Sequence, residues 1–147
     1  MAYKGRFSPL NPSKYKGNPS NIIYRSGLEL TLMSYFDKHP HVLSWSSEEV
    51  IIPYRSPLDS RIHRYFPDFW IKRKDIHNSI DQIIVEVKPL SQTRPPDRKS
   101  KATPRYINEV KNWGINNAKW EAAKTYCDDK GWKFQILTEK EINGYKY

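Results

Sequence analysis

An acid and a base stand two residues apart in a stretch that otherwise has the composition of a buried strand. The stretch is IIVEVKP, residues 83–89, where Glu86 and Lys88 interrupt a run of isoleucine and valine. β-Branched residues favour a pleated, buried surface, in which a charged side chain is costly unless a partner or a function justifies it. A second acid, Asp68, lies 18 residues before Glu86 and follows a proline in the β-prone stretch RYFPDFW.

Strand geometry brings these charged groups within reach of one another. Side chains alternate between the two faces of a strand, so Glu86 and Lys88 share a face with Ile84, and Asp68 shares a face with Trp70. If the two strands are neighbours in one sheet, the carboxylates of Asp68 and Glu86 converge beside the ammonium of Lys88. The pattern therefore predicts a charged pocket at the end of an apolar surface.

Two carboxylates beside an ammonium are suited to the metal-assisted hydrolysis of a phosphodiester. Carboxylate oxygens bind hard divalent cations such as Mg²⁺, and the cation polarises a phosphoryl oxygen and lowers the pKa of a bound water. A neighbouring lysine orients that water or stabilises the charge that develops on the phosphorane. We therefore predict a Mg²⁺ or Mn²⁺ site at Asp68 and Glu86, with Lys88 as a catalytic group. The alternative is an ion pair between Glu86 and Lys88 on a half-exposed strand, with Asp68 ending a turn.

Capping signals and apolar spacing predict the helices that frame this pocket. Ser26 and Glu29 form an S-x-x-E capping box, and the apolar spacing that follows predicts a helix over residues 26–38. A second helix is predicted over residues 116–129, where an apolar stripe is followed by a glycine that is placed to end the helix. A third, short helix is predicted after the capping residue Thr138.

The β-prone stretches predict a single sheet. They cover residues 41–47, 48–56, 61–73, 81–89 and 132–138. A meander is the simplest arrangement of the first four. The chain of 147 residues has the length of one ordinary domain. The order helix, several strands, helix, strand therefore predicts a mixed α/β domain in which helices flank one central sheet.

The net charge of +9 is concentrated in two segments. Residues 1–25 hold five basic residues and no acidic one, residues 89–105 hold five basic and one acidic, and the rest of the chain holds 15 of each. The first segment is rich in Pro, Gly, Asn and Ser, which predicts an extended basic arm over residues 1–25 before a domain over residues 26–147. Aromatic residues such as Tyr15 can pin this arm to the body or to a partner.

Clustered positive charge attracts polyphosphate, so we predict DNA as a partner. The proline-rich stretch 90–105 is predicted to be a mobile surface loop. Its candidates for contact with the DNA backbone, without reading of base sequence, are Arg94, Arg98, Lys99 and Lys101. Gln92 is a further candidate for contact with a phosphate or with the metal's coordination shell, and ordinary loop polarity is the alternative. For the charge as a whole, the alternative is a basic protein with solvated tails.

Composition argues against several other classes of protein. No run of 18 or more apolar residues is present, so we expect no membrane-spanning helix. The N-terminus lacks the apolar stretch of a secretory signal, and the single Cys127 can form neither an internal disulfide nor a cysteine-rich zinc site. We therefore expect a cytoplasmic protein with no membrane partner and no small-molecule cofactor.

The paired motifs resemble those of a known nuclease superfamily. The dipeptide PD at residues 67–68 and the tripeptide EVK at residues 86–88 resemble the PD-(D/E)xK motif of the restriction-endonuclease-like nucleases. The resemblance implies a restriction-endonuclease-like core. It also implies that Asp68 and Glu86 are metal ligands and that Lys88 is the catalytic lysine.

The wider layout is similar to that of the endonuclease subunit of Tn7-type transposases. Shared features are an early helix that bears a glutamate, a PDF strand, a strand ending in x-V-K, and a helix followed by the strand FQILTEKEI. That subunit carries glutamine where Glu86 stands, so this chain keeps the more usual acid. In such nucleases the first-helix glutamate completes the site, and Glu29 is its match, although Glu29 has an alternative role as the capping-box acid.

Most of the chain also resembles the head completion nucleases of T4-like tailed phages. The stretches that carry this resemblance include NPSKYKGNPSNIIYRS, WSSEEVIIPYRSPLD, EVKPLSQT and NNAKWEAAKTYC. The resemblance implies a nuclease that acts on phage heads after DNA packaging in the host cytoplasm, with portal or neck proteins as further partners and a place at the head opening of the virion. Two alternatives stay open: an adaptor that binds DNA or the portal without cleaving, and a nuclease that resolves branched DNA.

Overall fold

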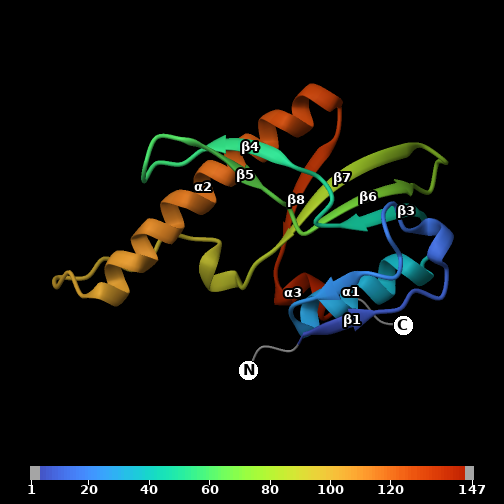
Figure 1. Cartoon of the computed structure of the whole chain (residues 1–147), viewed down its shortest axis with the longest axis horizontal. Helices are drawn as coiled ribbons and strands as arrows, with labels where there is room; N and C mark the ends of the chain where they lie inside the picture. Colours follow the sequence, from blue (N-terminus) through green and yellow to red (C-terminus); the bar gives the residue numbers. More distant parts are fainter. Residues whose placement is uncertain (1–3, 145–147) are drawn as a thin grey trace.

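The computed structural model describes residues 4–144, and its centre is a four-stranded mixed sheet (Figure 1). The strand order is β3–β6–β7–β8, in which β3, β6 and β7 pair antiparallel and β8 runs parallel to β7. The bounds of this sheet's strands are β3 Val42–Ser47, β6 Phe69–Lys74, β7 Ile80–Val87 and β8 Lys133–Leu137. The helices are α1 Gly27–Lys38, α2 Pro104–Lys130 and the short α3 Glu139–Ile142.

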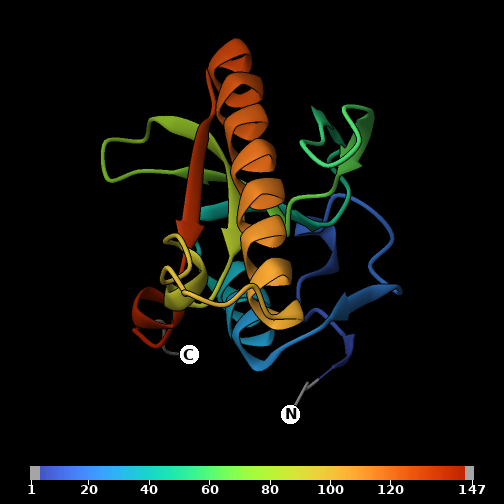
Figure 2. The ribbon, with the colours of Figure 1, turned by 90° about the vertical axis from the view of Figure 1, so that its left-hand side faces the viewer.

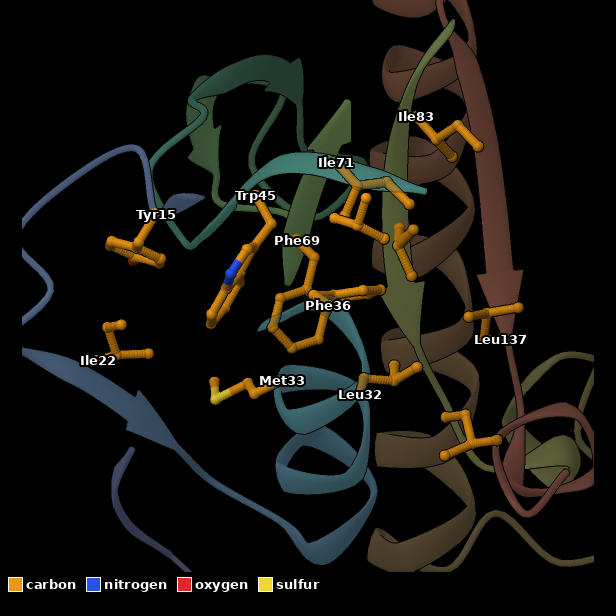
Figure 3. Packing of buried hydrophobic residues seen from close by; sticks show 13 residues of the cluster. Tyr15, Ile22, Leu32, Met33, Phe36, Trp45, Phe69, Ile71, Ile83 and Leu137 are labelled. Atoms are coloured by element: carbon orange, nitrogen blue, oxygen red, sulfur yellow. The ribbon is translucent and has the colours of Figure 1, made fainter. Parts of the chain in front are cut away.

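Helices α1 and α2 pack against opposite faces of this sheet. Side chains of α1, among them Leu32 and Phe36, pack on the odd-numbered residues Phe69 and Val85 of β6 and β7 (Figure 3). On the other face, Ala123 of α2 packs with Phe134 of β8, and Figure 2 shows α2 crossing over β7 and β8. The predicted α/β architecture with a central sheet flanked by helices is confirmed.

Local capping residues set where the helices begin and end. The predicted start of α1 and the predicted end of α2 are confirmed. The Ser26 hydroxyl accepts the Glu29 N–H at the start of α1, and Gly131 ends α2 with a φ of 71°, a left-handed conformation that glycine adopts without strain. However, α2 begins at Pro104 rather than at residue 116. Its first turns are mostly exposed, even at the apolar residues Ile107 and Val110, and they follow the proline-rich charged stretch that reads as a loop. Thr103 caps this helix, with proline at its first position.

The prediction of a four-strand meander is wrong. Strands β4 (Ile52–Arg55) and β5 (Ile62–Tyr65) form a separate two-stranded hairpin, and β3 pairs directly with β6. The stretch predicted as one strand over residues 61–73 is broken before β6, because Pro67 has no N–H to donate to a strand ladder. The hairpin therefore leaves the sheet at the end of β3 and returns to it at the start of β6.

Residues 4–25 of the predicted basic N-terminal arm are held against the body, and residues 1–3 lie outside the described part of the chain. This segment contains the strand pair β1 (Gly5–Phe7) and β2 (Ile22–Tyr24) and a 3₁₀ turn at Pro12–Lys14. Tyr15 is buried, with its ring centroid 4.8 Å from that of Trp45, and its hydroxyl accepts the Ser47 N–H at 3.1 Å. This aromatic residue pins the segment to the core. The division of the chain at residue 25 stays a prediction.

Asp37 provides a second attachment for this segment. The side chain is 1% exposed, and its two carboxylate oxygens accept the backbone N–H groups of Leu10 at 2.8 Å and Asn11 at 3.0 Å. Lys14 donates to the backbone carbonyl of Asp37 at 3.0 Å. Removal of the carboxylate would leave two backbone donors without their charged acceptor.

We expect Asp37→Ala to lower the free energy of unfolding by about 2 to 4 kcal/mol, because two hydrogen bonds to a charged group are lost. For a chain of this size the melting temperature should fall by roughly 5 to 12 °C. Thermal unfolding followed by circular dichroism measures the change, and limited trypsin digestion should show earlier cleavage at Lys14 and Lys16. Lys38→Ala, at an exposed neighbouring position, is the control. Equal melting temperatures for the two variants would contradict the role given to Asp37.

No helix within residues 4–144 is long and apolar enough to cross a membrane.

The stretch after β7 begins with a 3₁₀ turn at Leu90–Gln92 and then runs irregularly to Thr103, in agreement with the predicted loop. The mobility of this loop stays a prediction.

Candidate active site

Asp68 and Glu86 lie side by side where β6 begins and β7 ends. The antiparallel register pairs Phe69 with Val85, so the residues just beyond this pair face each other. The Asp68 N–H donates to Glu86 Oε1 at 3.3 Å, and the Val87 N–H donates to Asp68 Oδ2 at 2.7 Å. The predicted convergence of the two carboxylates is confirmed, and a backbone donor fixes the orientation of Asp68.

Lys88 follows the last residue of β7 and continues its pairing with β8. Its N–H donates to the carbonyl of Leu137 at 3.0 Å, and the alternation of the strand directs its side chain to the face of Glu86. The side chain is partly buried. Within residues 4–144 its ammonium forms no ion pair or hydrogen bond with Asp68 or Glu86, so the structure brings the two acids together but does not pair the lysine with them.

Glu29 lies in the first turn of α1 and takes part in the cap. Its Oε1 accepts the Arg25 N–H at 3.3 Å, and its own N–H donates to the Ser26 hydroxyl at 3.2 Å. The Glu29 carboxylate is also close enough to Asp68 to contribute to the raised pKa of that residue. The capping role is therefore observed, and the position is compatible with a role at the carboxylate pair.

The electrostatic environment disfavours charge on Asp68 and Glu29 when no cation is present. Burial, followed by repulsion from the Glu86 carboxylate, raises the pKa of Asp68 well above its ordinary value. Burial also raises the pKa of Glu29. A divalent cation between the carboxylates would offset this repulsion, and carboxylate oxygens are the donors that Mg²⁺ and Mn²⁺ prefer. The residues present thus fit such a cation.

The fit depends on water for the remaining ligands. Within residues 4–144, no three histidine, cysteine, aspartate or glutamate side chains lie together as a ready-made ligand set. Mg²⁺ is commonly held by one or two carboxylates and keeps several waters, so two protein ligands suffice. We therefore regard Asp68 and Glu86 as the core of a candidate metal site, with a third carboxylate nearby.

The raised pKa of Asp68 predicts how the stability of the metal-free protein depends on pH. The folded state binds this proton more tightly than the unfolded chain, so the contribution of Asp68 to stability is greatest below the ordinary aspartate pKa of about 3.9 and is lost as the pH rises through the raised value. Asp68→Asn removes the charge. In EDTA at pH 8 it should be more stable than the wild type by on the order of 1 kcal/mol, or roughly 3 °C in melting temperature.

Melting temperatures of both proteins between pH 5 and pH 8 in EDTA measure this effect. The advantage of Asp68→Asn should grow with pH, and saturating Mg²⁺ should reverse it, because the cation needs the carboxylate. A difference between the two proteins that is the same at every pH would show that Asp68 does not titrate as described.

Arg25 and Glu48 form a contact beside the candidate site that sequence analysis did not identify. The Arg25 guanidinium donates to both carboxylate oxygens of Glu48, at 3.1 and 3.0 Å, and the Glu48 N–H donates to the carbonyl of Asp68 at 3.2 Å. Glu48 has a φ of 55°, in the left-handed region. No local pattern marks this pair, because the contact joins residues 23 positions apart.

Tyr65 is a second residue that sequence analysis did not identify. It is 3% exposed, and burial together with the charge of Glu86 raises the pKa of its hydroxyl. The hydroxyl has no hydrogen-bond partner in the described part of the chain. The Lys119 ammonium of α2 lies 5.6 Å from the centroid of the Tyr65 ring and 5.8 Å from that of the Tyr54 ring. A cation therefore lies beside both tyrosine rings.

The predicted DNA-contacting residues lie on the surface of the loop before α2. All five, Gln92, Arg94, Arg98, Lys99 and Lys101, are exposed. Gln92 and Arg94 line a surface cleft of about 830 Å³ that continues to Arg105 and Trp113 of α2. Neither Asp68 nor Glu86 lines this cleft. The structure thus gathers part of the basic loop around a cleft, and the role of these residues stays a prediction.

Comparison with known proteins agrees with this geometry. Residues 39–139 match the family model described as TnsA-like endonuclease N terminal. The chain belongs to this endonuclease family. The matched segment includes Asp68, Glu86 and Lys88 but not Glu29. The chain is also 38% identical, over 152 aligned residues, to the head completion nuclease of Enterobacteria phage T4, and the alignment covers 99% of each protein. The resemblances to the Tn7-type endonuclease subunit and to the T4-like head completion nucleases are confirmed.

Proposed function

We propose that this protein is a metal-dependent endonuclease that hydrolyses phosphodiester bonds of DNA during the completion of phage heads after packaging. The endonuclease family and the T4 relative support the nuclease role and its place in head completion. The observation that carries the chemistry is the Asp68–Glu86 pair, in which two carboxylates meet at the ends of neighbouring strands and the pKa of Asp68 is strongly raised.

Asp68 and Glu86 would hold Mg²⁺ or Mn²⁺. When bound, such a cation supplies Lewis-acid polarisation of the scissile phosphate and a water of lowered pKa. The Val87 N–H holds one Asp68 oxygen at 2.7 Å and so leaves the other oxygen for a ligand. Burial of Glu86 limits its motion. These constraints preorganise the two acids before substrate arrives.

Lys88 and Glu29 would complete the site from two sides. Because the Lys88 ammonium has no partner among the two acids, it can approach the phosphate and stabilise the charge that develops there. Glu29 would bind the cation directly or through a water molecule. Its Oε1 would still accept the Arg25 backbone N–H. A crystal soaked in Mn²⁺ tests this arrangement, because the anomalous density should lie against Asp68 and Glu86.

The exposed loop side chains would hold the DNA backbone. They are Gln92, Arg94, Arg98, Lys99 and Lys101. Backbone contacts of this kind position the duplex without selecting a sequence. The site of action would be the host cytoplasm, with portal or neck proteins at the head opening as further partners and the virion as a further location.

Cleavage of DNA by the purified protein tests the proposal. We expect products from linear duplex DNA with Mg²⁺ or Mn²⁺ and none in EDTA, because two carboxylates alone cannot activate water for attack on a phosphodiester. Gel electrophoresis of labelled substrates measures the rate. Salt-sensitive binding without products, with either cation and at any DNA geometry, would instead favour an adaptor role. Products only from junctions would identify a branch-resolving nuclease.

A further inference from the structure

The hairpin β4–β5 has one buried and one open face. Its strands pair only with each other in the described part of the chain. On the inner face, Ile52, Tyr54 and Tyr65 pack against α2 around Ala123. Figures 1 and 2 show the hairpin lying along α2 and projecting away from the four-stranded sheet. Because side chains alternate along both strands, Pro53, Arg55, Ile62 and Arg64 face away from α2, whereas His63 shares the inner face with its cross-strand partner Tyr54.

The open face combines arginine with apolar side chains. Pro53 pairs across the hairpin with Arg64, and Arg55 pairs with Ile62. All four are exposed, Ile62 to 59%. The same face continues to Phe66, whose ring lies 5.7 Å from the guanidinium carbon of Arg64. Positive groups alternate with flat or branched apolar groups, which is the composition of a surface that contacts both phosphates and sugars.

The charge of the hairpin is uncompensated. Residues 50–67 contain three arginines and one acid, Asp59. That acid is already engaged, because its carboxylate lies 2.8 Å from Nε2 of His63 and accepts the Arg61 N–H at 2.9 Å. No described acidic side chain pairs with Arg55 or Arg64. A polyanion therefore meets no competing acid on this face.

The two segments that connect the hairpin to the central sheet meet at the candidate active site. The segment that follows β3 contains Glu48, whose N–H donates to the carbonyl of Asp68 at 3.2 Å. The returning strand reaches Asp68 two residues after Phe66. The arginine-bearing face thus begins at the edge of the carboxylate pair, and a ligand that lies along it is led to Asp68 and Glu86.

We propose that the open face of the β4–β5 hairpin holds double-stranded DNA and delivers its backbone to the carboxylate pair. The inference rests on the proposed function, in that the same DNA is the substrate. A two-stranded ribbon fits a duplex groove, where Arg55 and Arg64 contact phosphates and Ile62 and Phe66 contact the groove wall. The hairpin acts as a duplex-positioning element that is separate from the basic loop before α2.

Binding of labelled duplex DNA in EDTA tests the hairpin without any cleavage. We expect Arg55→Ala/Arg64→Ala to weaken duplex binding by about tenfold or more at moderate salt and to reduce the slope of log K against log salt by roughly 2, because two phosphate contacts are lost. The control is Lys38→Ala/Lys74→Ala, which removes the same charge at the last residue of α1 and at the last residue of β6, the end of that strand opposite to Asp68. Binding equal to that of the control would overturn the proposal, as would a loss confined to single-stranded DNA.

Photocrosslinking locates the bound duplex directly. Its readout is the formation of a crosslink, so a variant that fails to fold cannot imitate the expected result. With p-benzoylphenylalanine at Ile62, we expect a crosslink to duplex DNA under ultraviolet light. The same group at Ile76, which is 85% exposed in the β6–β7 turn, should give none. Equal crosslinking at both positions would overturn the assignment. A protein that crosslinks at Ile62 but never cleaves DNA would retain the hairpin contact and refute the nuclease function alone.

Discussion

Asp68→Asn is expected to reduce metal-dependent DNA cleavage by about 10³-fold or more, because the loss of a metal ligand removes several kcal/mol of transition-state stabilisation. The variant keeps the size of the side chain and an acceptor for the Val87 N–H, so the strand pairing should persist. Duplex binding in EDTA should not be weakened, because Asp68 offers no positive group to a phosphate and lies apart from the basic loop. Cleavage rates under single-turnover conditions and binding by fluorescence anisotropy separate the two effects.

Asp129→Asn is the matched control for this experiment. It makes the same chemical change at an exposed position near the end of α2 and should cleave like the wild type. Calorimetric titration with Mn²⁺ adds an independent readout, because Asp68→Asn should bind the cation far more weakly than the control. Cleavage by Asp68→Asn at the rate of Asp129→Asn would remove the carboxylate pair from the mechanism.

Lys88→Met is expected to lower the cleavage rate by about 10² to 10³-fold, the size of effect seen when one preorganised group that stabilises transition-state charge is removed. Methionine keeps much of the aliphatic length and loses the ammonium. Mn²⁺ affinity should change little, because Lys88 is not a ligand and forms no ion pair with Asp68 or Glu86 within residues 4–144. This split between rate and metal affinity distinguishes a catalytic lysine from a structural one.

Lys72→Met provides the comparison for Lys88. Lys72 lies on β6, on the same face as Trp70, and is four residues from Asp68, or about 13 Å along the strand. It should therefore retain cleavage. If Lys88→Met lost metal affinity and rate in parallel, the lysine would be needed to build the site rather than to act in the chemical step.

Asp68 connects three segments of the chain through its backbone and side chain. Its N–H donates to Glu86, its carbonyl accepts from Glu48, and its carboxylate accepts from Val87. The end of β3, the start of β6 and the end of β7 are thus joined at one residue. A carboxylate held this firmly would be preorganised for the proposed cation, which would offset the burial and repulsion that raise the pKa of Asp68.

The sequence predicted those features that depend on local chemistry. Alternation along IIVEVKP and RYFPDFW predicted that Glu86 and Asp68 converge if the two strands are neighbours, and the observed pairing of Phe69 with Val85 meets that condition. The caps at Ser26 and Gly131 were also visible, since a cap needs only a few adjacent residues. The wider layout of the motifs resembles that of the Tn7-type endonuclease, and the family match over residues 39–139 agrees.

Only the tertiary structure decided which strands are neighbours and what surrounds the site. Pro67 breaks a stretch that reads as one strand, so β4 and β5 become a projecting hairpin and β3 pairs with β6. Long-range pairing depends on the packing of the whole core, which no local pattern encodes. For the same reason the Arg25–Glu48 contact, the position of Tyr65 beside Glu86 and the hold of Asp37 on the N-terminal segment became visible only in three dimensions.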